Sequence, residues 1–263
     1  MSDRLAVLAR AAELIRGGRV SDAEALLQRA AATDPRDAGA RLLLASILLA
    51  SARAGEALTL LEKAVAISPD DPSAVSALSA ALGRLGRARE AADRLRHAVE
   101  RLPDNAQLWT NFGVINEQLG EMHAALAAYD RALALPGTPA AARMNRGVLL
   151  AARGDLVAAL ENNQTFAAEA PREPAAHLNL AEVLNALERY REAAAACDDA
   201  LALAPEYAKA WIVRGFARAA LGELDAARAD FQRARGIDGH ALAGSGRATP
   251  GAEGGSAWTV GLA

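Results

Sequence analysis

The strongest constraint on the fold of this chain is a fixed 34-residue period. Proline or glycine recurs along it without an insertion, at Pro35, Pro69, Pro103, Gly137, Pro171, Pro205 and Gly239. A fixed period of this length indicates a repeat array, in which each repeat packs only against its neighbours. The sequence therefore predicts one elongated array over residues 1–239 rather than one or two globular domains.

The period divides the chain into seven blocks with a common pattern. They cover residues 4–37, 38–71, 72–105, 106–139, 140–173, 174–207 and 208–239. The twentieth residue of every block is alanine and the eighth is alanine, serine or glycine, so that two helices can approach closely. Glycine is frequent in the fifteenth place, where it favours the left-handed conformation that ends a helix. Each block is therefore predicted to form a helix–turn–helix unit.

The fourth block carries this pattern most fully, with Trp109, Phe112, Gly113, Gly120, Ala125, Tyr129 and Ala132. These residues, together with the period and the closing proline, resemble the tetratricopeptide repeat. The resemblance implies an all-α fold, a right-handed α-solenoid of seven helix–turn–helix units whose first helices line a concave surface. It also implies a protein or peptide partner bound in that groove.

Some blocks depart from the pattern. Ala52 and Glu188 replace the helix-ending glycine, and Asn163 stands where an aromatic residue is usual. We therefore expect the second helix of the fifth block to pack loosely or to shift. Between the fourth and fifth blocks, Pro136 and Pro139 predict an irregularity in the array.

Residues 240–263 differ in composition from the array. They are rich in glycine and alanine, which predicts a flexible tail. Near the end, Trp258, Val260 and Leu262 alternate with small residues, so a short docking strand is the alternative interpretation.

Composition argues against several classes of function. The net charge of −3 and the lack of a basic stripe argue against a nucleic-acid partner. No apolar stretch is long enough to insert into a membrane. The single cysteine, Cys197, fits a reducing, cytoplasmic location and is expected to be a packed core thiol. The four histidines lack metal-ligand spacing, so we expect no catalytic residues, no metal, no cofactor and no enzyme activity.

The candidate binding site is a row of asparagines in the sixth place of successive blocks, Asn111, Asn145 and Asn179. An amide both donates and accepts, so such a row could hold the backbone of an extended peptide. The row resembles the asparagine ladder in the superhelix of O-linked N-acetylglucosamine transferase. The alternative is that these amides stabilise local turns. Polar residues expected to edge the same surface are Gln107, Thr110, Glu117, Glu182, Asn185 and Lys209.

The first two blocks suggest a different surface, an apolar strip of Leu5, Leu8, Ile15, Leu42 and Leu49. If exposed, the strip would suit an amphipathic partner helix or self-association into a homo-oligomer; alternatively, several of these residues pack against neighbouring repeats. Three functions follow: a peptide-binding module, a self-associating scaffold, and the substrate-docking arm of a separate transferase.

Overall fold

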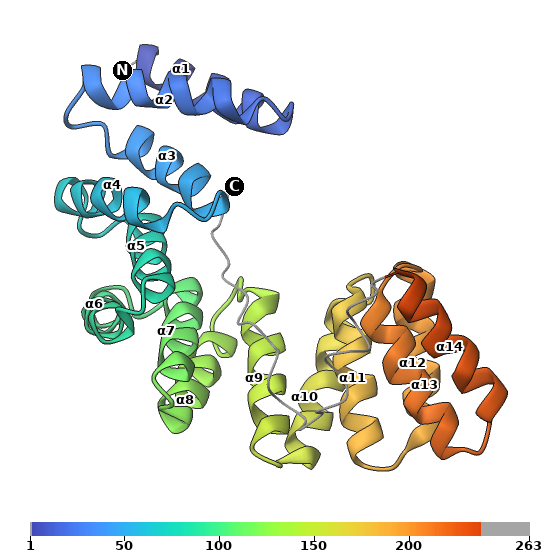
Figure 1. Cartoon of the computed structure of the whole chain (residues 1–263). Coiled ribbons are helices and arrows are strands. Elements are labelled where there is room, and N and C mark those ends of the chain that lie inside the picture. Colours follow the sequence, from blue (N-terminus) through green and yellow to red (C-terminus); the bar gives the residue numbers. More distant parts are fainter. Residues whose placement is uncertain (1, 238–263) are drawn as a thin grey trace. The chain divides into compact units, whose positions relative to one another are not determined.

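The computed structural model describes residues 2–237, and every regular element in this part of the chain is an α-helix (Figure 1). The helices alternate along the chain between a first and a second helix of each repeat. The first helices are α1 (Ser2–Arg16), α3 (Ala38–Ala50), α5 (Pro72–Arg84), α7 (Ala106–Gln118), α9 (Ala140–Ala152), α11 (Pro174–Ala186) and α13 (Ala208–Ala220). The second helices are α2 (Val20–Thr33), α4 (Ala54–Ile67), α6 (Ala88–Arg101), α8 (Met122–Leu133), α10 (Leu156–Glu169), α12 (Tyr190–Leu203) and α14 (Leu224–Ile237).

Helix boundaries follow the 34-residue period. From α3 onward each first helix begins at the first residue of its block, and every second helix begins at the seventeenth. At the start of several first helices a side-chain oxygen accepts a hydrogen bond from a backbone N–H group, as Asp71 does for α5 and Asn105 does for α7. The all-α solenoid of helix–turn–helix units predicted from the sequence is confirmed.

The turn inside each repeat has one residue in the left-handed region, at the fifteenth place. Its φ lies between 58° and 84° in all seven repeats, at Gly18, Ala52, Gly86, Gly120, Gly154, Glu188 and Gly222. Ala52 and Glu188 therefore adopt the conformation that glycine adopts elsewhere, although a Cβ makes it unfavourable. The repeat frame, and not glycine alone, fixes this turn.

The core lies between the two helices of each repeat and continues between neighbouring repeats. The alanines of the twentieth place are almost fully buried in every repeat, and the small eighth residue leaves room for a side chain from the second helix. A Cβ on Gly113 would lie only 2.3 Å from the Tyr129 ring, and one on Gly215 would lie 2.6 Å from the Phe231 ring. These close approaches explain why the eighth residue is small.

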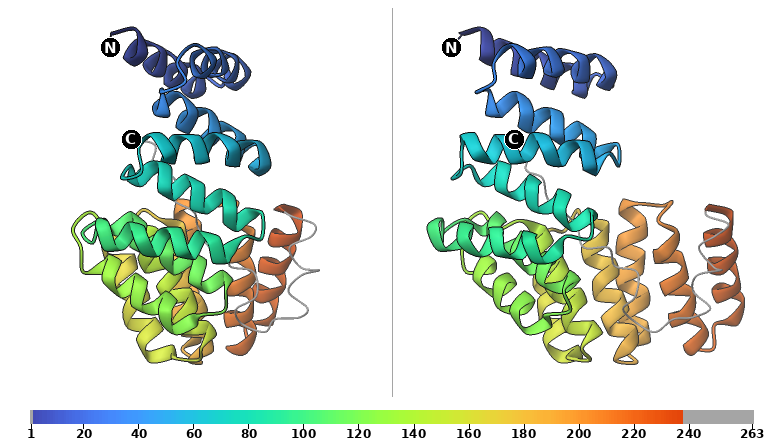
Figure 2. Two further views of the ribbon diagram at one scale, coloured as in Figure 1. Left: turned by 90° about the vertical axis from the view of Figure 1, so that its left-hand side faces the viewer. Right: turned by 60° about the vertical axis from the view of Figure 1, so that its left-hand side comes forward.

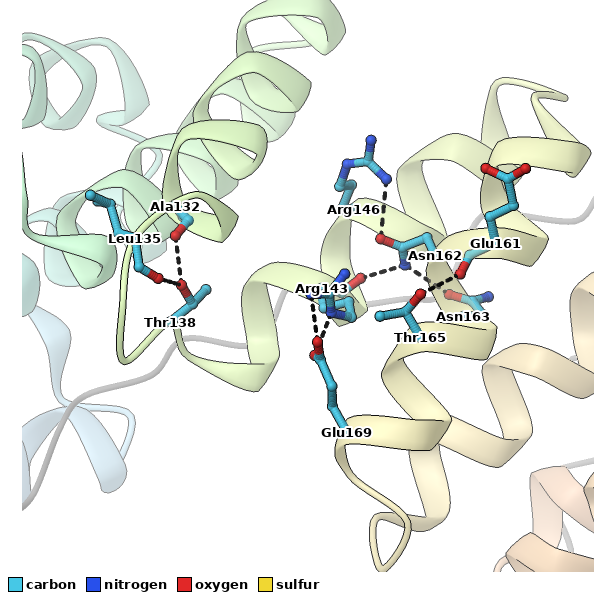
Figure 3. Close-up of polar contacts among 10 residues, drawn as sticks. All are labelled: Ala132, Leu135, Thr138, Arg143, Arg146, Glu161, Asn162, Asn163, Thr165 and Glu169. Atoms are coloured by element: carbon cyan, nitrogen blue, oxygen red, sulfur yellow. Dashed lines mark hydrogen bonds and ion pairs between the residues drawn. The ribbon is translucent and has the colours of Figure 1, made fainter.

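The described part of the array comprises two compact units, with the boundary between Pro139 and Ala140. Unit 1 contains α1–α8 and unit 2 contains α9–α14; in each, helix pairs stack side by side (Figure 2). The boundary follows the segment where Pro136 and Pro139 predicted an irregularity. Helix α8 has 12 residues where the other second helices have 14, and Thr138 closes its end by donating its hydroxyl to the carbonyls of Ala132 and Leu135 (Figure 3). The tail predicted for residues 240–263 lies outside the described residues.

Candidate functional site

The predicted site residues of unit 1 are bonded within that unit. The Oδ1 of Asn111, which is almost fully buried on α7, accepts a hydrogen bond from Nε2 of Gln107 at 2.9 Å. Thr110 is fully buried and donates its hydroxyl to the carbonyl of Ala106 at 2.8 Å. In this unit the asparagine ladder is thus one residue whose carbonyl oxygen already has a partner.

Glu117, the last predicted site residue of unit 1, pairs with α8. Its carboxylate accepts a hydrogen bond from the hydroxyl of Tyr129, the ring that lies over Gly113. Burial raises the pKa of the Glu117 carboxyl, and the Tyr129 hydroxyl opposes part of that rise. Glu117 therefore connects α7 to α8 through the Tyr129 hydroxyl and does not offer a free carboxylate.

In unit 2, two of the predicted asparagines present donors without a partner. Asn145 on α9 is 5% exposed, and its Nδ2 has no hydrogen-bond partner among the described residues. The Nδ2 of Asn179, one repeat later on α11, is likewise buried and unpartnered there. A buried donor without a partner costs about 1–3 kcal/mol, so these two amides are the part of the unit that most needs an acceptor.

The remaining predicted residues of unit 2 connect α11 with α13. Nζ of Lys209 lies 2.8 Å from Oε1 of Glu182, which neutralises both charges. Nδ2 of Asn185 donates to the carbonyl of Val213 at 3.0 Å, whereas its Oδ1 is buried and has no partner among the described residues. We call the side of unit 2 formed by α9, α11 and α13 the first-helix face; it carries two orphaned donors and one orphaned acceptor.

Beneath this face lies a buried network of amides that sequence reasoning missed (Figure 3). Nδ2 of Asn163 on α10 donates to the main-chain carbonyl of Asn179 at 3.0 Å, and its Oδ1 accepts from Nδ2 of Asn162, also at 3.0 Å. The Asn162 amide also donates to the carbonyl of Arg143 and accepts from the guanidinium of Arg146, both on α9. The network thus joins α9, α10 and α11.

The loose packing expected for the second helix of the fifth block is wrong. Helix α10 begins and ends at the same places of its block as the other 14-residue second helices, and Phe166 is 2% exposed. Asn163 is 1% exposed because it bonds to Asn162 and to the Asn179 carbonyl instead of leaving a gap. Its signal in the sequence is its place: the twenty-fourth residue of the other six blocks is apolar, namely Leu27, Leu61, Leu95, Tyr129, Cys197 and Phe231.

The apolar strip predicted for unit 1 is not continuous on the surface. Leu5 is 66% exposed, but Leu49 is only 3% exposed and belongs to the core. Leu8, Ile15 and Leu42 are partly buried and pack against that core. Packing between neighbouring helices therefore buries Leu49 fully and three further residues in part, which favours the alternative that several of these residues pack against neighbouring repeats.

Chemistry outside this face is limited. The described residues contain no group of three or more His, Cys, Asp or Glu side chains that could hold a metal ion. Cys197 is fully buried, as expected, and burial raises the pKa of its thiol to about 12. A thiol with that pKa is not a nucleophile at neutral pH. Over residues 2–237, no helix is both long and apolar enough to cross a bilayer.

Sequence comparison identifies the repeat. Family models described as the tetratricopeptide repeat match residues 14–82, 77–139, 158–208 and 178–241. These segments together span most of the chain. No curated protein matches the sequence.

Solved structures with the same arrangement of helices are distant in sequence. A tetratricopeptide repeat protein from Parabacteroides merdae is 17% identical with a TM-score of 0.67, over 90% of this chain and 94% of that one. PilW, a type IV pilus biogenesis factor, is 21% identical with a TM-score of 0.67, over 76% of this chain and 92% of its own. YrrB, described as a TPR protein with an unusual peptide-binding site, is 22% identical with a TM-score of 0.50, over 70% and 95% respectively. At these identities the likeness is one of fold.

Proposed function

The chain belongs to the tetratricopeptide repeat family, and we propose that it is a non-catalytic module that binds an extended peptide of a partner protein on the first-helix face of unit 2. The family supports a role in protein–protein interaction in general. The peptide, its place on the chain and the residues that bind it are our proposal. The observation that carries it is the pair of unpartnered amide donors of Asn145 and Asn179.

A peptide backbone is the ligand that suits these amides. Each Nδ2 can donate to a carbonyl, and every residue of a peptide supplies one regardless of its side chain. Packed helices lie roughly 8–10 Å apart, or about three residues of extended chain. Both Nδ2 atoms are shielded from solvent in this structure, so we propose that each amide turns toward the surface as a strand crossing α9 and α11 supplies one carbonyl to Asn145 and another to Asn179. YrrB, with its peptide-binding site, is a precedent for peptide binding on this fold.

Electrostatics on the same face favours a ligand without a strong charge. Lys209 and Glu182 neutralise each other, and the orphaned atoms belong to amides. The self-association alternative has less support, because Leu49 is buried and Leu8, Ile15 and Leu42 pack partly against the core. A docking role for a separate transferase would use the same peptide-binding face and stays a prediction.

The test replaces both orphaned donors in the full-length chain. A short peptide is first selected from a random library against the wild-type chain, and its affinity is measured by fluorescence polarisation. The double variant Asn145→Ala/Asn179→Ala should weaken binding by about tenfold or more, because two ligand carbonyls lose their donors.

The matched control is Asn111→Ala, which removes the equivalent amide from unit 1. Because Asn111 is bonded to Gln107, this variant should bind the peptide as the wild type does. A library that yields no binding peptide, or a double variant with wild-type affinity and intact helicity, would contradict the proposal.

A further inference from the structure

We propose that Asn163 is a positioning residue for the first-helix face: its buried amide holds α11 in the register that places the donors of Asn145 and Asn179. This inference rests on the proposed function, since it assigns a role in peptide binding to a residue that the peptide does not touch. Asn163 lies on the second helix α10, and 1% of it is exposed.

An amide is unusual at the place of Asn163 in the repeat. In the other six repeats the same position holds an apolar residue, with a leucine in each of the first three. A buried amide is stable only when its donor and its acceptor are both satisfied, and Asn163 meets that condition through two bonds of 3.0 Å. Since leucine fills this space elsewhere without any such bonds, the fold does not require the amide.

The two hydrogen bonds of Asn163 end close to the two unpartnered donors. Nδ2 of Asn163 donates to the main-chain carbonyl of Asn179, the residue whose side chain is an orphaned donor. Its Oδ1 accepts from Asn162, whose amide is tied to Arg143 and Arg146 on α9 (Figure 3). Asn145 lies on α9 between these two arginines. A chain of hydrogen bonds thus connects the turn that carries one donor with the residue that carries the other.

The absence of a side chain at Gly147 makes room for the Asn163 amide. A Cβ on residue 147 would lie 2.0 Å from Oδ1 of Asn163, so Gly147 allows the amide to sit directly against α9. Apolar contacts are not directional, and helices that pack through them alone can slide by a fraction of an ångström. Hydrogen bonds are directional, so this network fixes the axial position of α11 relative to α9. The spacing of the two donors follows from that position.

The experiment separates positioning from stability. In the full-length chain, Asn163→Leu introduces the residue found at this place in the first three repeats. Unfolding in urea should show a stability equal to or above that of the wild type, because an apolar side chain replaces a buried amide. Affinity for the selected peptide should nevertheless fall about tenfold, since one donor is no longer aligned. Should the leucine variant fail to fold, Asn163→Met provides a more adaptable apolar side chain for the same comparison.

A double-mutant cycle and a control complete the test. In an Asn179→Ala background, Asn163→Leu should cause no further loss of affinity, because the donor that it positions is already absent. Phe231→Leu, at the same place of the seventh repeat, should leave affinity unchanged. Wild-type affinity in Asn163→Leu, or additive losses in the cycle, would overturn the positioning role but not the proposed function. Wild-type affinity in Asn145→Ala/Asn179→Ala would instead remove the proposed function and this inference with it.

Discussion

The fourth and fifth repeats share one helical frame but fill it differently. In the fourth, the Tyr129 ring lies over Gly113 and its hydroxyl bonds to Glu117. In the fifth, the amides of Asn162 and Asn163 lie over Gly147. In both repeats the glycine is indispensable to the contact, whereas the group above it is aromatic in one and polar in the other. The frame therefore specifies the space between its helices but not the chemistry that fills it.

The largest change in the free energy of unfolding is expected when the side chain that lies over the glycine is shortened to alanine in each of the two repeats. Tyr129→Ala should lower the free energy of unfolding by about 4 kcal/mol, because a fully buried ring leaves a cavity. Asn163→Ala removes a smaller group and two hydrogen bonds, for an expected loss of about 2 kcal/mol. Urea unfolding followed by circular dichroism measures both losses. Equal losses would show that the Tyr129 ring and the Asn163 amide contribute equally to stability, contrary to this expectation.

Adding a methyl group at the glycine of either repeat should lower the free energy of unfolding by somewhat less. A Cβ would lie 2.3 Å from the Tyr129 ring in Gly113→Ala and 2.0 Å from the Asn163 amide in Gly147→Ala. Each variant should lose about 2 kcal/mol in the same unfolding experiment, since a buried group must shift. Gly55→Ala is the control: nothing lies within 4 Å of its Cβ, so the variant should be slightly more stable. A tolerated Gly147→Ala would mean that the amides move aside more easily than the ring.

Substitutions at the left-handed turn residues should change the free energy of unfolding of each unit by a smaller amount. Ala52 in unit 1 and Glu188 in unit 2 have φ near 58° and 59°. Ala52→Gly and Glu188→Gly should each raise the free energy of unfolding by about 1 kcal/mol, because glycine adopts this conformation without strain. The reverse change at an equivalent turn, Gly154→Ala, should lower it by a similar amount. Stabilities unaffected by all three would show that these turns carry no strain.

The smallest expected effect is a pH dependence from Glu117 of the fourth repeat that the fifth repeat lacks, since the equivalent residue there is Ala151. Burial raises the pKa of Glu117, so the folded chain binds this proton more tightly than the unfolded chain. Its ionised form opposes folding at neutral pH, and the opposition disappears as pH falls below the ordinary carboxyl range. The melting temperature of the wild type should therefore rise relative to that of Glu117→Gln as pH is lowered from 7. A constant difference across that range would contradict a raised pKa.

Much of the fold could be predicted because the same physical requirement recurs in every repeat. The alanine of the twentieth place is buried wherever two helices of a pair cross, and the fifteenth residue is left-handed wherever a first helix ends. The sequence thus repeats the alanine seven times and the glycine five times. Even Ala52 and Glu188, which depart from the rule, adopt the predicted backbone.

The candidate site was less predictable because it depends on partners that the period does not specify. The row of Asn111, Asn145 and Asn179 is visible in the sequence, but the Gln107 bond that occupies Asn111 depends on side-chain geometry. Leu49 has the same apolar character as Leu5, and the tertiary packing decides that one is buried and the other exposed. Asn162 and Asn163, the centre of the amide network, lie on the second helix α10, where no pattern of first-helix residues would locate them.

The constant length of the repeats has a consequence for how such a chain can change. The sixth place of the seven blocks holds Ala9, Leu43, Ala77, Asn111, Asn145, Asn179 and Val213. Because blocks one to six have the same length, exchanging one of them for another would place this residue at a new site on the scaffold and keep the 34-residue register of the sequence. Recombination between repeats of the same gene would thus change which residue stands at each sixth place, and with it the ligand preference, while the repeat register stays the same.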